Sequence, residues 1–133
     1  MKNIIYREVI LDLYRNPKNK GEIKDADFEA KSANPLCGDT IKIQLKMKNS
    51  TSLPARQESK VIEKAVFSGS GCVISQASAS LICSYITGKK LSEIKKIKSD
   101  DIIKLIGVRP SPSRLGCAIL SLKALKEVLK NAV

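Results

Sequence analysis

The strongest constraint on the fold is a strict alternation of apolar and polar residues in the segment TIKIQLKMK, residues 40–48. Successive side chains of a β-strand point to opposite faces, so this pattern predicts a strand with one buried face. A second predicted strand, VIEKAVF at 61–67, follows the polar stretch 49–60, which we expect to be the loop of an antiparallel hairpin. A shorter strand is expected at 26–33, around Phe28.

The other apolar segments repeat with a helical period, and Asn16-Pro17 and Gly88 are typical residues for ending two of these helices. The stretch 109–113 is rich in Pro and Ser and is expected to be an extended linker. Three strands followed by helices predict an α+β fold, a three-stranded antiparallel sheet packed against helices, in one domain spanning residues 1–133. The predicted helices cover residues 3–15, 73–87, 91–97, 99–107 and 118–131.

Composition narrows the chemistry and the location that we expect. No apolar run approaches the roughly 20 residues of a membrane span, and charges interrupt the first apolar segment, so we expect a cytoplasmic protein without a signal peptide. The chain has four cysteines, which in the cytoplasm favour metal binding or thiol chemistry over disulfides. It has no histidine, so the usual zinc ligand and the usual general base are both absent.

The formal net charge of +11 raises the question of an anionic partner. The lysines are scattered along the chain, and three tyrosines and two phenylalanines are few for a base-stacking platform. We therefore expect a solvated, lysine-rich surface. A basic nucleic-acid-binding module with a zinc ion is kept only as a remote alternative.

Three of the four cysteines lie at predicted element boundaries. Cys37 precedes the central strand, Cys72 follows a Ser- and Gly-rich turn and opens a helix, and Cys117 is expected to open the last helix. A helix N-terminus favours a thiolate, the form that binds metals and attacks sulfur. The spacings are long and contain no CxxC pair, so a buried structural cysteine remains the alternative at each position.

Asp39 is a candidate ligand for the same metal as these three cysteines, whereas Cys83 is not. Asp39 lies two residues after Cys37, so both side chains can reach one metal from an extended segment, although a turn or capping aspartate is the alternative. Cys83 lies in an apolar helical run, about 16 Å from Cys72 at about 1.5 Å per residue, and is expected to pack in the core. We predict a metal site formed by Cys37, Asp39, Cys72 and Cys117.

Four segments carry a resemblance to a known family. They read YREVILDLYRNPKNKG at 6–21, NPLCGD at 34–39, GSGCVISQASAS at 69–80 and RLGCAIL at 114–120. In this order they closely resemble the U-type iron–sulfur scaffold family, which comprises IscU, SufU and the N-terminal domain of NifU. The first segment is similar to the SufU branch.

This resemblance implies a fold of three antiparallel strands with packed helices and a site that binds zinc or a [2Fe–2S] cluster. It implies that Cys37, Cys72 and Cys117 take up sulfur and hold the cluster, and that Asp39 matches the family's acidic ligand. The implied partners are a PLP-dependent cysteine desulfurase and apo iron–sulfur proteins as recipients. The chain would then be a scaffold or sulfur acceptor rather than a turnover enzyme; the alternative is a zinc-dependent sulfur-transfer partner that activates the desulfurase and holds no cluster.

The chain departs from the family pattern next to its third cysteine. IscU proteins carry histidine and SufU proteins usually lysine where this chain has Gly116. We expect Cys117 to be the most accessible thiol, because it follows the predicted linker, lies beside Gly116 and has Arg114 nearby. Cys117 is therefore the predicted first sulfur acceptor.

Overall fold

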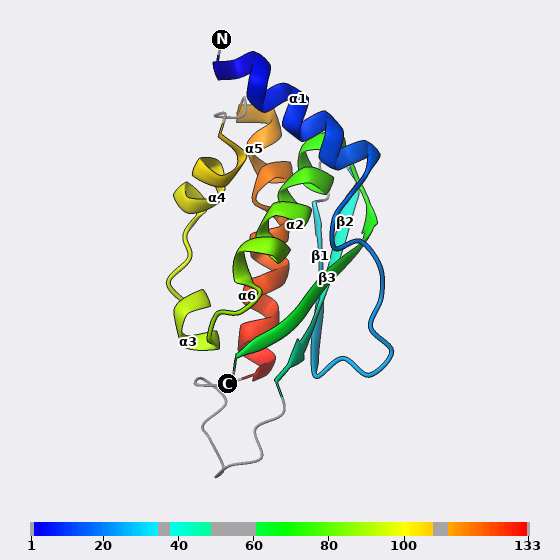
Figure 1. The fold of residues 1–133 in the computed structure, drawn as a ribbon, viewed down its shortest axis with the longest axis vertical. Coiled ribbons are helices and arrows are strands. Elements are labelled where there is room, and N and C mark those ends of the chain that lie inside the picture. The colour runs from blue at the N-terminus through cyan, green and yellow to red at the C-terminus, as the bar shows by residue number, and fades with distance from the viewer. Residues whose placement is uncertain (1, 35–37, 49–60, 108–111, 133) are drawn as a thin grey trace.

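The protein is built on a three-stranded antiparallel sheet with helices packed over one face (Figure 1). The computed structural model describes residues 2–34, 38–48, 61–107 and 112–132. The strands β1 (Phe28–Asn34), β2 (Asp39–Met47) and β3 (Ile62–Ser70) lie in the order β1-β2-β3, which confirms the predicted α+β class. The helices are α1 (Lys2–Arg15), α2 (Val73–Ile86), α3 (Leu91–Ile94), α4 (Ser99–Ile106), α5 (Pro112–Ala118) and α6 (Leu120–Ala132).

The apolar face of β2 forms the centre of the core. Ile41, Ile43 and Leu45 are completely buried, as their alternation with polar residues predicts. Helix α6 packs against β1 and β2, and α2 packs against β3, so these two helices cover the apolar face of the sheet (Figure 1). Burying large aliphatic side chains stabilises a fold by about 1.5–3 kcal/mol each, so this layer contributes substantially to the stability of the domain.

The polar face of β2 is also partly covered, which the alternation did not predict. Gln44 is 6% exposed. Its side-chain oxygen accepts a hydrogen bond from the Ile23 N–H at 3.0 Å, and its amide donates to the Ile23 carbonyl at 3.2 Å and to Glu29 at 3.0 Å. The polar segment between α1 and β1 therefore lies along this face and satisfies the buried amide.

Helices α2, α3 and α4 agree with the sequence in position but not always in length. Helix α2 ends before Gly88, whose φ of 89° is the left-handed conformation expected of a glycine at this place. Helix α3 stops at Ile94, so the prediction of a helix over 91–97 is too long. No helix in the described part of the chain is long and apolar enough to cross a bilayer.

The prediction of an extended linker followed by one last helix is wrong where the structure describes it. Pro112 is the first residue of α5, a position where the missing N–H of proline costs no helical hydrogen bond. A break at Ile119 separates α5 from α6, and the Ser78 hydroxyl on α2 donates to the Ala118 carbonyl at 2.6 Å. This contact comes from a distant helix, so local sequence could not reveal it. Residues 109–111 of the linker and the loop at 49–60 lie outside the described residues.

Gly69 allows β3 to approach the start of β2, where Asp39 lies. Its φ is 125°, and a Cβ atom there would overlap the Thr40 carbonyl oxygen. Gly69→Ala is therefore expected to lower the free energy of unfolding by about 1–3 kcal/mol through backbone strain alone. The overlap with the Thr40 carbonyl oxygen should add to this loss. Urea denaturation would measure the loss.

Gly88→Ala is the matched control for this substitution. Gly88 also has a positive φ, but nothing lies within 4 Å of the Cβ that alanine would add. We expect a smaller loss in this variant, because it carries backbone strain without the overlap. Equal losses in the two variants would contradict the role given to the Thr40 contact.

Candidate metal centre

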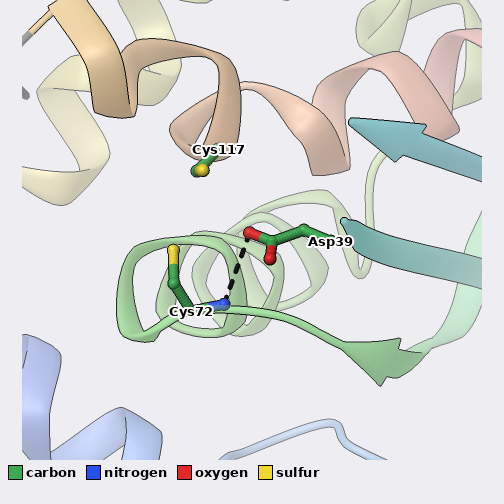
Figure 2. A group of neighbouring side chains, drawn as sticks. All are labelled: Asp39, Cys72 and Cys117. Carbon is green, nitrogen blue, oxygen red and sulfur yellow. Dashed lines mark hydrogen bonds between the residues drawn. The ribbon is translucent and has the colours of Figure 1, made fainter. Parts of the chain in front are cut away.

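Three of the four predicted ligands meet at the end of the sheet where β2 begins. Asp39 comes from β2, Cys72 from the start of α2 and Cys117 from α5, and their side chains point toward one another (Figure 2). The carboxylate oxygen and the two sulfur atoms that could bind a metal all lie within 4.8 Å of one another. The fold thus brings together groups that lie far apart in the sequence.

Asp39 is held in place before any ligand arrives. It is the first residue of β2, is 6% exposed, and pairs with Asn34 in the β1–β2 register. Its Oδ2 atom accepts a hydrogen bond from the Cys72 N–H at 3.3 Å (Figure 2). Asp39 therefore satisfies a backbone donor at the start of α2 while remaining beside both thiols.

Cys72 opens α2, as its Gly-rich approach predicts. It is the N-cap residue, with an extended backbone at φ −76° and ψ 174°, and its carbonyl accepts the Gln76 N–H at 3.1 Å. Its thiol is free and the residue is partly exposed. The partial positive charge of a helix N-terminus suits an anionic ligand set at this position.

Cys117 differs from its prediction in two respects. It lies one residue before the end of α5 rather than at the start of the last helix, and it is only 1% exposed. The expectation that it is the most accessible thiol is therefore wrong, since Cys72 is more exposed. The reason is that Cys117 lies in the unexpected helix α5, which packs against α2, rather than after an extended linker. The Asn34 amide donates to the Cys117 sulfur at 3.9 Å.

Cys37, the fourth predicted ligand, lies outside the described residues. The two residues that flank its short segment are both placed beside the site. Asn34 reaches the Cys117 sulfur, and the Gly38 N–H donates to the Asn34 carbonyl at 2.8 Å, immediately before Asp39. Ligation by Cys37 stays a prediction.

The donor set fits the metals that the sequence predicts. Thiolates and carboxylates both bind zinc, with bonds of about 2.0–2.3 Å, and thiolates bind the iron of iron–sulfur clusters. Ligand atoms of a tetrahedral zinc site are then about 3.8 Å apart. Atoms within 4.8 Å of one another need to approach by only about 1 Å to reach this geometry.

Cys83 is separate from the site and belongs to the core. It is completely buried in α2, and the group of potential metal ligands found among the described residues does not include it. Burial raises the pKa of the Cys83 thiol to about 12, because the surrounding apolar side chains disfavour the thiolate. This thiol is therefore protonated at neutral pH and serves as packing, as predicted.

The buried Cys83 thiol should make stability fall in alkaline solution. Above its ordinary pKa of 9.0 the unfolded chain loses this proton while the folded chain retains it up to about 12. The free energy of unfolding should then fall by roughly 1 kcal/mol per pH unit in this window. Urea denaturation at about pH 8 and about pH 10.5 would measure the fall. Cys83→Ala lacks this proton and should show a shallower fall, whereas parallel curves would contradict the assignment.

Comparison with known proteins identifies the family to which the chain belongs. The family model for the NifU-like N terminal domain matches residues 5–132. The chain is 37% identical over 140 residues to the zinc-dependent sulfurtransferase SufU of Bacillus subtilis, covering 92% of this chain and 88% of that protein. It is 34% identical over 144 residues to the iron–sulfur cluster assembly scaffold protein IscU of Thermotoga maritima, covering 96% and 94%.

Solved structures agree with the fold. The SUF-system protein FiSufU from Fervidobacterium islandicum AW-1 superimposes with a TM-score of 0.70 at 27% identity, covering 95% of this chain and 97% of that one. The N-terminal part of a NifU-like protein from Brucella abortus shares the fold, with a TM-score of 0.72 at 20% identity over 96% of this chain and 94% of that one. Since the family model spans almost the whole sequence, the chain belongs to the NifU-like N-terminal domain family.

Proposed function

We propose that this protein takes up sulfur from a cysteine desulfurase and holds an iron–sulfur cluster while the cluster is assembled. The observation that carries the proposal is the convergence of Asp39, Cys72 and Cys117, with ligand atoms within 4.8 Å of one another. Cys37 is the proposed fourth ligand, contributed by the segment between Asn34 and Gly38. The proposal treats residues 1–133 as one domain, which is supported by a hydrophobic core drawn from α1, the sheet, α2 and α6.

Sulfur uptake by this site would be a thiol exchange reaction. A scaffold thiolate attacks the outer sulfur of a cysteine persulfide on the desulfurase, the sulfur–sulfur bond breaks, and the desulfurase thiolate leaves. The scaffold cysteine then carries the persulfide. Cys117 is the proposed first acceptor. A bound zinc ion would supply positive charge that keeps its cysteine ligands deprotonated.

Delivery to Cys117 requires access to a nearly buried sulfur. We infer that the desulfurase must displace part of the cover around α5 before transfer, because Cys117 is 1% exposed. The Asn34 amide, which donates to this sulfur at 3.9 Å, favours negative charge on it. The assembled cluster would then pass to apo iron–sulfur proteins.

A second function is favoured by the ligand types together with one of the similar proteins. The chain has no histidine, and glycine occupies position 116, so the proposed ligands are cysteine thiolates and one carboxylate. Such a set suits zinc as well as iron. Together with the 37% identity to a zinc-dependent sulfurtransferase, this favours a zinc-bound sulfur-transfer partner that activates the desulfurase and holds no cluster.

One experiment separates the two functions. The protein is purified without oxygen, its metals are measured, and it is incubated with iron, cysteine and a cysteine desulfurase. A new visible absorption band from thiolate-bound iron, with loss of any zinc, supports the scaffold. Persulfide formation with zinc retained supports the sulfur-transfer partner, and neither persulfide nor cluster would contradict both.

The proposed desulfurase partner should meet a basic pocket beside the metal centre. Arg15, Lys20 and Gln76 help to line a cavity of about 480 Å³ that also includes Gly71, the residue before Cys72. Among the described residues, neither Arg15 nor Lys20 forms an ion pair. Two cations without counterions next to the site suit acidic side chains of a docking protein.

We expect association with the desulfurase to slow by roughly tenfold or more when salt rises from about 50 mM to about 500 mM, because exposed charges are screened. The variant Arg15→Gln/Lys20→Gln should associate more slowly than wild type at low salt. The control Lys96→Gln/Lys104→Gln loses the same charge at exposed positions on the α3–α4 side. Stopped-flow fluorescence would measure the rates, and equal rates for the two variants would exclude a role for this pocket.

A further inference from the structure

Gly116 lies inside a helix, where glycine weakens the local structure. The absence of a side chain at this position therefore calls for a physical reason. Gly116 is in α5, and its φ is not in the left-handed region, so the backbone would accept any L-residue there. Alanine is the better helix former at such a position. Glycine is thus an unfavourable choice for the helix itself. Its presence beside the metal centre indicates that a neighbouring group needs the volume that a side chain would fill.

The Asn34 side chain occupies this space. A Cβ atom added at Gly116 would lie 2.9 Å from Asn34 Nδ2, closer than side-chain carbons normally approach. The same Nδ2 atom donates to the Cys117 sulfur at 3.9 Å. Any larger residue at 116 would therefore push the amide away from the sulfur or move α5.

Asn34 is well placed to fix the position of this sulfur. Its backbone is held as the last residue of β1, paired with Asp39 across the sheet, and its carbonyl accepts the Gly38 N–H. Only its side chain reaches across to α5. The amide thus connects the β1–β2 end of the site, which carries Asp39, with the helix that carries Cys117.

We propose that Asn34 is the positioning residue for Cys117 and that Gly116 is glycine in order to admit it. By donating to the sulfur, Asn34 holds the Cys117 Sγ toward Asp39 and Cys72. Outer groups that hydrogen-bond to metal ligands orient them and typically change metal affinity 10–100-fold. The inference rests on the proposed metal centre and assigns to it a residue that does not touch the metal.

The test compares Asn34→Ala, Gly116→Ala and the double variant with wild type. Each protein is loaded with zinc, and release to a chromophoric chelator is timed. Each single substitution should accelerate release about 10–100-fold. The double variant should be no faster than the faster single variant, because both changes remove one contact. Asn16→Ala, an exposed asparagine after α1, is the control and should release zinc at the wild-type rate.

Two further readouts separate positioning from a loss of folding. Cobalt(II) bound to the single variants should show a shifted thiolate charge-transfer band, because the Cys117 sulfur has moved. The melting temperature of metal-free Gly116→Ala should be equal to or above that of wild type, since alanine favours the helix.

Some results would contradict the role of Asn34 alone, and others would contradict the metal centre. Wild-type release rates in both single variants, or losses that add in the double variant, overturn the role of Asn34. A Gly116→Ala protein that melts below wild type, while Asn34→Ala retains zinc normally, assigns Gly116 to packing and also overturns it. A wild-type protein that binds neither zinc nor cobalt overturns the metal centre itself, and the inference with it.

Discussion

Replacing any one of Cys37, Cys72 or Cys117 with serine is expected to remove nearly all bound metal, from about one ion per chain to roughly a tenth or less. A serine hydroxyl is a poor substitute for a thiolate, and loss of one ligand from a four-ligand site leaves too little binding free energy to retain the ion during purification. Elemental analysis of protein purified without oxygen would measure the ratio of metal to chain.

Cys83→Ser is the matched control because it changes the same atom in the core of α2. Its metal content should equal that of wild type, although its stability should fall, since a hydroxyl replaces a completely buried thiol. Unchanged metal content in all three of the first variants would disprove the site. If only Cys72→Ser and Cys117→Ser lost bound metal, these two cysteines would stand as ligands and Cys37 would be excluded as one.

Cys117→Ser is also expected to abolish early sulfur uptake, which would be the largest effect on the proposed activity. The proposed transfer begins at this thiol, and serine cannot form a persulfide. Mass spectrometry after a short incubation with a desulfurase and cysteine would show one added sulfur on the wild-type peptide that contains Cys117. The variant should show almost none on any peptide.

Because Cys117 is buried, the same experiment also tests Cys72 as the alternative first acceptor. Cys72 is the more exposed thiol, so it would be the first acceptor if access alone decided the order. Sulfur uptake by Cys117→Ser at the wild-type rate, with the added mass on the Cys72 peptide, would overturn the assignment. Cys83→Ser should take up sulfur normally, because that thiol is buried and far from the site.

The central strand shows why part of this fold could be predicted. Its alternation reports which side chains are buried, and Ile41, Ile43 and Leu45 are buried as expected. Burial of Gln44 was not predictable, since it depends on a separate segment that supplies the Ile23 backbone. Local periodicity therefore identified the strands, most of the helices and the core, but not helix α5 or the packing of loops on the sheet.

The metal centre could also be predicted only in part. The Ser- and Gly-rich segment before Cys72 predicted a helix start, and α2 begins there, although β3 continues to Ser70 where a turn was expected. The helix that contains Cys117 was missed because its proline was interpreted as part of a linker. The Ser78 hydroxyl donates to the Ala118 carbonyl at the end of this helix, and the Asn34 amide donates to the Cys117 sulfur. These contacts join residues distant in sequence, for which one sequence carries no signal.

The order of the site residues along the chain also has a consequence for synthesis. Asp39 and Cys72 are translated well before Cys117, which lies about 45 residues after Cys72. At about 5–20 residues per second, a ribosome needs about 2–9 seconds to add that stretch. During this interval the nascent chain carries an incomplete ligand set, because α5 and its Cys117 have not yet been made. The proposed four-ligand site can therefore be complete only after that helix has been translated.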